Sequence, residues 1–367
     1  MSAASPTATT TTTQAPTGFH LLTVSRVDRL TREAIAVSFE VPPALAEQFA
    51  FRAGQHLTLR REMDGQDVRR TYSVCSSAAG GPLRVAVKLL DGGLFSTWAI
   101  EHLSCGDELE VGPPSGRFGP TVDATRTRRY GLIAAGSGIT PVLSIAATVL
   151  DVEPTSEVLL IYGNRTSSDV MLLDELADLK DRWPERLSVL HVLSREQQAS
   201  ELLSGRLDRD RLQRLLATLV PVDSVDEWYL CGPFGMVTDG RQTLLDAGAD
   251  PAGVHVELFH ADPAPPRKRT RTSSAGLSAV TVMLHGRTTT VQVDPQGEPI
   301  LEAVLAARSD APYACKGGVC GTCRARCTSG AVEMDVNYAL EPDEIATGVV
   351  LTCQAHPTTP EVVLDFL

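Results

Sequence analysis

The sequence predicts a multidomain protein in which an antiparallel β-barrel, an α/β unit with a parallel sheet and a small α+β unit follow one another. The 367 residues are more than one compact core usually organises, so two or three units are expected. The apolar pattern changes along the chain, from short alternating runs to strands that alternate with helices. A Pro- and Ser-containing basic segment at 263–278 then precedes a last stretch with its own strands and helix.

The first unit, residues 18–125, carries the barrel prediction. Short β-rich runs are separated by turn residues such as Asp64-Gly65, which is the spacing of a small antiparallel barrel. The stretch GGLFSTWAIEHL at 92–103 predicts one short helix. Residues 1–17, rich in Thr, Ala and Pro, lack the charged and apolar regions of a secretory signal, and their composition predicts a disordered tail.

The second unit, residues 126–262, has the pattern of a doubly wound parallel sheet. Four apolar strands, YGLIAAG, EVLLIYGN, LSVLHVLS and EWYLCGP, alternate with helical segments. In such sheets ligands collect in the crevice at the carboxyl ends of the strands. We therefore expect the binding residues of this unit to follow its strands directly.

The third unit, residues 279–367, opens with two alternating strands and the helix PILEAVLAARS. It is acidic, with five Lys or Arg against eleven Asp or Glu from Val280 to Leu367. The linker 263–278 before it predicts a hinge on which this unit moves. Its basic cluster is interpreted as a solvated hinge, with an anion or partner site as the alternative. The cluster consists of Arg267, Lys268, Arg269 and Arg271.

Charge and cysteine content exclude several classes of protein. The formal net charge of −12 argues against nucleic acid as a partner, because no broad basic surface can neutralise phosphates. The apolar run from Gly131 to Leu150 contains Gly136 and Pro141, so we interpret it as a strand, a turn and a helix rather than a membrane span. Four of the eight cysteines fall within thirteen residues, which favours metal ligation in a reducing cytoplasm over a disulfide framework.

Four cysteines in the third unit have the spacing of a plant-type 2Fe–2S site, C-x4-C-x2-C with a distant fourth cysteine. Gly317, Gly318 and Gly321 allow a loop that turns its backbone N–H groups toward the sulfurs. A zinc site is the alternative, but zinc sites usually pair C-x2-C with a second such pair or with histidines. The predicted cluster ligands are Cys315, Cys320, Cys323 and Cys353.

Two segments of the first unit predict a flavin site. The run Arg70-Thr71-Tyr72-Ser73 offers a cation for a pyrophosphate, an aromatic face for the isoalloxazine ring and a hydroxyl for its N5. A second segment leads from a glycine turn into the start of a helix, where free N–H groups bind phosphate. The predicted phosphate-binding residues of this segment are Gly93, Ser96 and Thr97.

Two motifs of the second unit predict a nucleotide site. One follows the first strand and is not the G-x-G-x-x-G of common dehydrogenases, yet its glycines still permit close approach of a pyrophosphate. It contributes Gly136, Gly138, Thr140 and Pro141. The other ends the last predicted strand and contributes Cys231, Gly232 and Pro233. Cys231 is interpreted as functional, with a buried core cysteine as the alternative.

Together these motifs resemble the ferredoxin–NADP reductase superfamily, and the third unit resembles the plant-type β-grasp ferredoxins. The resemblance implies FAD in the barrel and a nicotinamide nucleotide in the second unit, with Cys231 beside the nicotinamide C4. Tyr72, Ser73 and Cys231 are then the predicted catalytic residues. A Glu-x-Phe segment is implied to return to the flavin, so that Phe259 either covers the ring or is a core aromatic.

The resemblance also bears on the choice of nucleotide. Arg165 and Arg195 occupy positions that bind the 2′-phosphate in NADP-preferring members, so NADPH is the predicted substrate. Glu196 next to Arg195 is the residue type that would favour a free ribose instead.

Within this superfamily the stretches 161–196 and 313–357 resemble the reductase subunits of ring 1,2-phenylacetyl-CoA epoxidase. That family implies electron transfer from NADPH through FAD and the 2Fe–2S cluster to a di-iron oxygenase in phenylacetate degradation. Alternatives are the reductase of a Rieske ring hydroxylase, a steroid hydroxylase or a desaturase, and a reductase of quinones or oxygen. A redox-sensing module without turnover is the alternative from another class, but such a sensor needs only the cluster.

Overall fold

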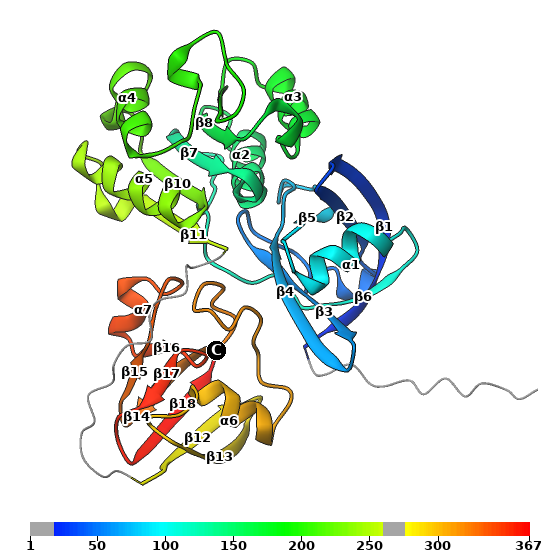
Figure 1. Cartoon of the computed structure of the whole chain (residues 1–367), viewed down its shortest axis with the longest axis vertical. Coiled ribbons are helices and arrows are strands. Elements are labelled where there is room, and N and C mark those ends of the chain that lie inside the picture. The colour runs from blue at the N-terminus through cyan, green and yellow to red at the C-terminus, as the bar shows by residue number, and fades with distance from the viewer. Residues whose placement is uncertain (1–17, 260–275) are drawn as a thin grey trace, which may run out of the picture.

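The computed structural model describes residues 18–259 and 276–367. The predicted tail 1–17 and most of the predicted linker 263–278, including its basic cluster and the hinge motion expected of it, lie outside the described residues. The rest of the chain forms the predicted multidomain architecture (Figure 1). A barrel in blue, a sheet-and-helix unit in green and a small unit in orange and red meet at one junction.

The barrel is a six-stranded antiparallel sheet with the strand order 4-3-6-1-2-5. Its elements are β1 (His20–Thr31), β2 (Ala34–Glu40), β3 (His56–Met63), β4 (Gln66–Ser73), β5 (Leu83–Lys88), α1 (Leu94–His102) and β6 (Glu108–Val111). The sheet closes where Val74, just beyond β4, pairs with Val85 of β5. Alternate residues such as Leu57 and Leu59 fill its interior, and Phe95 of α1 joins them.

The second unit is a five-stranded sheet in which all neighbours are parallel, with the order 11-10-7-8-9. Its elements are β7 (Arg129–Ala135), α2 (Ile139–Val152), β8 (Glu157–Asn164), α3 (Leu173–Arg182), β9 (Leu187–Leu193), α4 (Arg209–Leu219), β10 (Glu227–Gly232), α5 (Phe234–Asp246) and β11 (Val254–Leu258). The helices α2 and α3 cover one face, and α4 and α5 cover the other. The fifth strand, β11, is not among the four predicted strands, because only its two end residues are buried.

The third unit is a mixed sheet with the order 13-12-18-14-16, in which β12 and β18 are parallel. Its elements are β12 (Ser278–Leu284), β13 (Arg287–Val293), α6 (Ile300–Ala307), β14 (Arg324–Ser329), β15 (Val332–Met334), α7 (Pro342–Ala346), β16 (Val349–Leu351), β17 (Ala355–Pro357) and β18 (Glu361–Phe366). The helix α6 packs Ile300, Leu301 and Val304 on this sheet. The long segment between α6 and β14 carries the first three cysteines.

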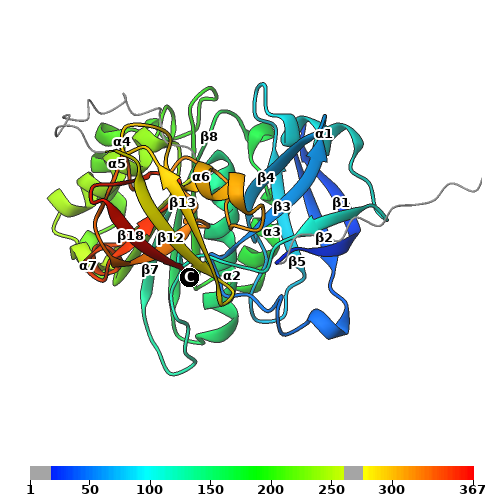
Figure 2. The ribbon, with the colours of Figure 1, turned by 90° about the horizontal axis from the view of Figure 1, so that it is seen from below.

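The third unit lies against both other units, and its ribbon is seen beside them in Figure 1 and Figure 2. Phe234 at the start of α5 packs edge-on against Tyr338, with ring centroids 5.7 Å apart. Arg117, after the barrel, forms an ion pair of 3.1 Å with Glu344 of α7. None of the helices within 18–259 and 276–367 combines the length and the apolar character needed to cross a bilayer.

Candidate functional site

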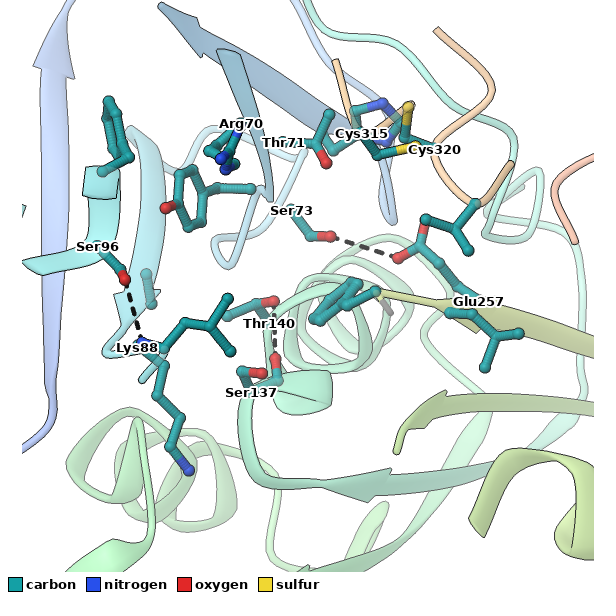
Figure 3. Close-up of a pocket in the computed structure, with 18 of the residues that line it drawn as sticks. Arg70, Thr71, Ser73, Lys88, Ser96, Ser137, Thr140, Glu257, Cys315 and Cys320 are labelled. Atoms are coloured by element: carbon teal, nitrogen blue, oxygen red, sulfur yellow. Dashed lines mark hydrogen bonds between the residues drawn. The ribbon is translucent and has the colours of Figure 1, made fainter. Parts of the chain in front are cut away.

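A cavity of about 360 Å³ lies where the three units meet, which is within the size range of small-molecule sites. Figure 3 shows the cysteines Cys315 and Cys320 at one end and Ser96 with Lys88 at the other. The predicted site residues that line this cavity are Arg70, Tyr72, Ser73, Gly93, Ser96, Thr140, Phe259, Cys315 and Cys320. Those that do not line it are Thr97, Gly136, Gly138, Pro141, Arg165, Arg195, Cys231, Gly232, Pro233, Cys323 and Cys353.

The predicted flavin motif forms the end of β4, and all four of its residues line the cavity. Tyr72 lies in a tilted arrangement with Phe95 of α1, with ring centroids 5.6 Å apart. Burial raises the pKa of the Tyr72 hydroxyl far above its usual value, so it stays neutral. Arg70 is fixed by a hydrogen bond of 2.8 Å from Nη1 to the carbonyl oxygen of Arg69. The wall therefore offers an aromatic face and a cation side by side.

The start of α1 lies beside this wall, because its Phe95 packs against Tyr72. Its cap residue Gly93 supplies no side-chain acceptor, so the first N–H groups of the helix are left for a ligand. A Cβ at Gly93 would stand 2.7 Å from Ser96 Oγ, which explains why glycine is needed beside that serine. The Ser96 hydroxyl accepts a hydrogen bond from the N–H of Leu90 at 3.0 Å. Lys88 adds a cation that the sequence analysis did not identify.

The principal residue that sequence reasoning missed is Glu257, on β11. Ser73 Oγ donates a hydrogen bond of 3.3 Å to Glu257 Oε2 across the junction of barrel and sheet (Figure 3). Burial raises the pKa of the Glu257 carboxyl to about 8, against the smaller opposite effect of the Ser73 hydroxyl. The Glu-x-Phe segment was the sequence feature that could have identified Glu257 as a site residue, since Phe259, two residues further on, lines the same cavity.

The nucleotide motifs meet behind this cavity, where the turn Gly136–Gly138 packs on the end of β10. A Cβ at Gly138 would lie 2.1 Å from the carbonyl oxygen of Cys231, so only glycine permits this approach of two backbones. Cys231 is fully buried, and burial raises the pKa of its thiol well above the usual value. Its parallel-strand partner in β11 is Glu257, which places the two residues on neighbouring strands.

The two predicted phosphate-binding arginines come together at the far edge of the sheet. The N–H of Arg195 donates a hydrogen bond of 2.8 Å to the carbonyl oxygen of Arg165, beyond the ends of β9 and β8. Arg165 is half exposed and lies 3.9 Å from Glu33. Glu196 is held by the N–H of Ser167 at 2.8 Å. Its carboxylate therefore already has a backbone partner.

The four predicted ligand cysteines lie in two pairs. A hydrogen bond from the Cys320 thiol, aided by the Gly317 N–H at 3.3 Å from Cys315 Sγ, lowers the pKa of Cys315 to about 5. A hydrogen bond from Cys323 likewise lowers the pKa of Cys353. Within the described ranges no three His, Cys, Asp or Glu side chains gather around one metal-ion position. Two thiols on each side suit two irons better than a single ion.

The residues thus fit the groups that the motifs imply. Thiols and inward-pointing N–H groups suit an iron–sulfur core, and the Gly318 and Gly321 backbones have φ of 76° and 66°, which favour glycine. The flavin wall combines an aromatic ring with a cation and a helix start. Cys327, the fourth of the cysteines that fall within thirteen residues, is partly buried against the core of the third unit. Its thiol donates a hydrogen bond of 3.5 Å to the carbonyl oxygen of Ser329.

Comparisons with known proteins match each unit. An oxidoreductase FAD-binding domain matches residues 21–119, an oxidoreductase NAD-binding domain residues 132–242, and a 2Fe-2S iron–sulfur cluster binding domain residues 282–358. The cofactors of the chain are therefore FAD and a 2Fe–2S cluster, with NAD(P)H as the nucleotide.

Whole proteins match over nearly their full length. A subunit of 1,2-phenylacetyl-CoA epoxidase from Escherichia coli (strain K12) is 47% identical over 350 residues, covering 95% of this chain and 98% of that protein. The ferredoxin reductase component of 3-ketosteroid-9-alpha-monooxygenase from Rhodococcus rhodochrous is 34% identical over 367 residues, covering 97% and 100%. The structure of phthalate dioxygenase reductase shares the fold with a TM-score of 0.58 at 24% identity, covering 95% and 98%. The chain belongs to the same family as this phenylacetyl-CoA epoxidase component, a family of oxidoreductases that join an FAD-binding, an NAD-binding and a 2Fe–2S domain in one polypeptide.

Proposed function

We propose that this protein is the reductase component of a multicomponent di-iron oxygenase, in which it carries electrons from NADPH to the oxygenase that epoxidises phenylacetyl-CoA. The observation that carries the proposal is the shared cavity, which Cys315 and Cys320 line together with Tyr72 and Ser73. A cluster ligated there faces the flavin site directly, so electrons need not leave the chain between the two.

The cofactors supply the redox chemistry, and the protein binds and orients them. When bound, FAD accepts two electrons as a hydride and releases them singly, which matches a two-electron donor to a one-electron cluster. The protein supplies orientation and electrostatics. Tyr72 offers a neutral aromatic face, and Arg70 and the start of α1 offer positive charge and N–H groups for the pyrophosphate.

The carboxyl ends of the parallel strands supply the nucleotide half of the site. Gly138 allows the turn before α2 to rest on Cys231, and Thr140 Oγ1 donates a hydrogen bond of 3.0 Å to the carbonyl oxygen of Ser137. Both features hold the start of α2 ready for a pyrophosphate. Arg165 and Arg195, joined by a backbone hydrogen bond, form the proposed clamp for a 2′-phosphate and hence the preference for NADPH.

Ser73 and Glu257 form the proposed polar end of the hydride path. With a carboxyl pKa of about 8, Glu257 is mainly protonated at neutral pH, so it places no full negative charge beside the arriving hydride. Phe259 lines the same wall, where an aromatic ring can cover the flavin until the nucleotide displaces it.

Two candidate oxygenases follow from the relatives. The epoxidase component supports a phenylacetyl-CoA epoxidase through 47% identity over 95% of this chain. The steroid monooxygenase component supports a steroid hydroxylase more weakly, at 34% identity. The acidic third unit, with five Lys or Arg against eleven Asp or Glu from Val280 to Leu367, fits a partner with a basic docking surface in either case.

Reconstitution tests the proposal. The purified holoprotein is mixed with NADPH and the oxygenase subunits of a phenylacetyl-CoA epoxidase, with and without phenylacetyl-CoA, and the CoA thioesters are analysed by mass spectrometry. An oxygenated thioester formed in step with NADPH loss is the expected result. NADPH oxidation that reduces cytochrome c but forms no oxygenated thioester would contradict the partner assignment, and product with a 3-ketosteroid oxygenase instead would favour the second candidate.

A further inference from the structure

Arg69, on β4 of the barrel, is buried by the third unit. Only 3% of its surface is exposed. Its guanidinium carbon lies 4.1 Å from the centroid of the Tyr313 ring, well within the range of a cation–π contact. Nη1 and Nη2 donate hydrogen bonds of 3.4 Å to the carbonyl oxygens of Ala311 and Ser309. Three positions of one segment in the third unit therefore surround this side chain.

The barrel holds Arg69 ready for this contact. Asp67, on the same strand, accepts from Arg69 Nη2 at 2.8 Å and from Nε at 3.2 Å. Asp67 also accepts from Arg60 Nε at 2.9 Å, and Phe19 lies 5.2 Å from the Arg69 guanidinium carbon. An arginine oriented by a carboxylate on its own strand loses little conformational freedom when a partner arrives.

The position of Arg69 in the sequence links the two redox sites. The residue after it, Arg70, begins the flavin motif, and Tyr72 and Ser73 follow on the same strand. On the other side of the contact, Tyr313 lies two residues before the cluster ligand Cys315, which lines the flavin cavity. A single side chain thus connects the strand that forms the flavin wall to the segment that leads into the cluster loop.

We propose that Arg69 is a positioning residue that clamps the segment 309–313 and thereby holds the cluster loop against the flavin cavity during internal electron transfer. The inference rests on the proposed function and names a residue outside the lining of the cavity. Its chemistry is that of a buried guanidinium whose three nitrogens are all hydrogen-bonded and which lies over an aromatic ring. Lys cannot reproduce this arrangement, because an ammonium lacks the planar fork.

A second arginine, Arg117, also contacts the third unit, but it is more exposed and its partner has another ion pair. Arg117 reaches Glu344 at 3.1 Å, but the Arg117 side chain is 59% exposed, against 3% for Arg69. Exposed ion pairs contribute little, because water and salt screen them. Glu344 also keeps a second partner, Arg324, at 3.3 Å when Arg117 is removed. Of these two arginine contacts, Arg69 is therefore the one whose loss should release the segment 309–313.

The test uses the full-length holoprotein in five forms: wild type, three single variants and the Arg69→Ala/Tyr313→Leu double variant. Arg69→Ala removes the clamp from the barrel side, and Tyr313→Leu removes the aromatic ring from the other side. Arg61→Ala is the matched control, since Arg61 makes its cation–π contact of 4.0 Å with Trp98 within the barrel. Amide hydrogen exchange of residues 309–320 reports the opening of the interface, and anaerobic stopped-flow mixing with NADPH follows flavin and cluster reduction separately.

Arg69→Ala and Tyr313→Leu should each speed exchange in 309–320 by about 10- to 100-fold, the loss of one buried charge-assisted contact. The double variant should add little to Arg69→Ala, because Arg69→Ala already removes the cation–π contact that Tyr313→Leu breaks. Flavin reduction by NADPH should stay unchanged while reduction of the cluster slows, and Arg61→Ala should behave as wild type. Exchange in 309–320 that is the same in all forms would overturn the clamp. If wild type itself failed to reduce its cluster with NADPH, the proposed function would be contradicted instead. The hydrogen-exchange rates would still show whether Arg69 holds the segment 309–313.

Discussion

Ser73 Oγ and Glu257 Oε2 are joined by a hydrogen bond of 3.3 Å that connects the flavin strand of the barrel to the last strand of the nucleotide sheet. The two residues are 184 positions apart in the chain. Cys231 is the neighbour of Glu257 on the adjacent strand. The serine and the carboxyl thus join the two halves of the redox site, and the cysteine lies on the strand next to the carboxyl.

The raised pKa of the Glu257 carboxyl should make the stability of the folded protein depend on pH. Its pKa is raised from 4.5 to about 8 on folding, so the folded protein holds a proton that the unfolded chain releases. This contribution is fully present below pH 4.5 and is lost as pH rises toward 8. Glu257→Gln should therefore match wild type in melting temperature near pH 5 and exceed it near pH 9. Calorimetry at both pH values checks this, with Glu62→Gln, an exposed barrel carboxyl, as the control. A melting temperature for Glu257→Gln below wild type at pH 9 would contradict the assignment.

Gly138 should tolerate no side chain. Its added Cβ would meet the Cys231 carbonyl oxygen at 2.1 Å, and this oxygen belongs to backbone that cannot move aside. Gly138→Ala should cost about 1–3 kcal/mol in the free energy of unfolding and raise the KM for NADPH. Gly235→Ala is the matched control in the same unit, because nothing lies within 4 Å of its Cβ position. Denaturant unfolding and steady-state kinetics measure the two effects, and equal behaviour of both variants would refute the close approach.

Substitutions can distinguish the predicted cluster ligands from Cys327, which is not a predicted ligand. Cys353→Ser should lower the bound iron by about tenfold or more and abolish the cluster absorbance, while FAD stays bound. Cys327→Ser should keep both, because Cys327 packs against the core of the third unit and pairs with neither couple of thiols. Iron analysis and visible absorption spectra of the purified variants decide the matter. A cluster lost equally in both variants would argue against the proposed ligand set.

Arg165 should set the preference for NADPH. Its removal takes away a charge-assisted contact to the 2′-phosphate, so Arg165→Ala should raise the KM for NADPH by roughly tenfold and leave that for NADH unchanged. Arg214, an exposed arginine of the same unit paired with Glu201 at 3.8 Å, provides the control. If wild type already used NADH as well as NADPH, the clamp formed with Arg195 would have no such role.

Local sequence patterns predicted much of this site because its chemistry is encoded in short segments. The Arg70–Ser73 motif, the turn Gly93–Ser96 and the first two cluster cysteines are short segments, and they bring their residues to the same cavity. Glu257 and Arg69 were not predicted as site residues, since their roles depend on packing between units. Ser73 and Glu257 are separated by 184 residues, and Arg69 and Ala311 by 242. No periodicity records contacts over such distances.

The strand β11 was missed for a related reason. Its interior positions are only partly buried, so it lacks the continuous apolar pattern that identified the other four strands of that sheet. It is a strand because it completes the sheet beside β10, from Trp228–Val254 to Gly232–Leu258. Its carboxyl end then delivers Glu257 and Phe259 to the cavity.

The most direct test of the central claim follows electrons across the cavity in a single turnover. The holoprotein is mixed anaerobically with NADPH, flavin absorbance is recorded by stopped flow, and samples frozen over the same interval are examined by electron paramagnetic resonance. If electrons pass from the flavin wall to the cluster at Cys315 and Cys320, the flavin signal should change first. The signal of a reduced 2Fe–2S cluster should follow within one turnover. Flavin that is reduced while the cluster stays oxidised over many turnovers would contradict the account.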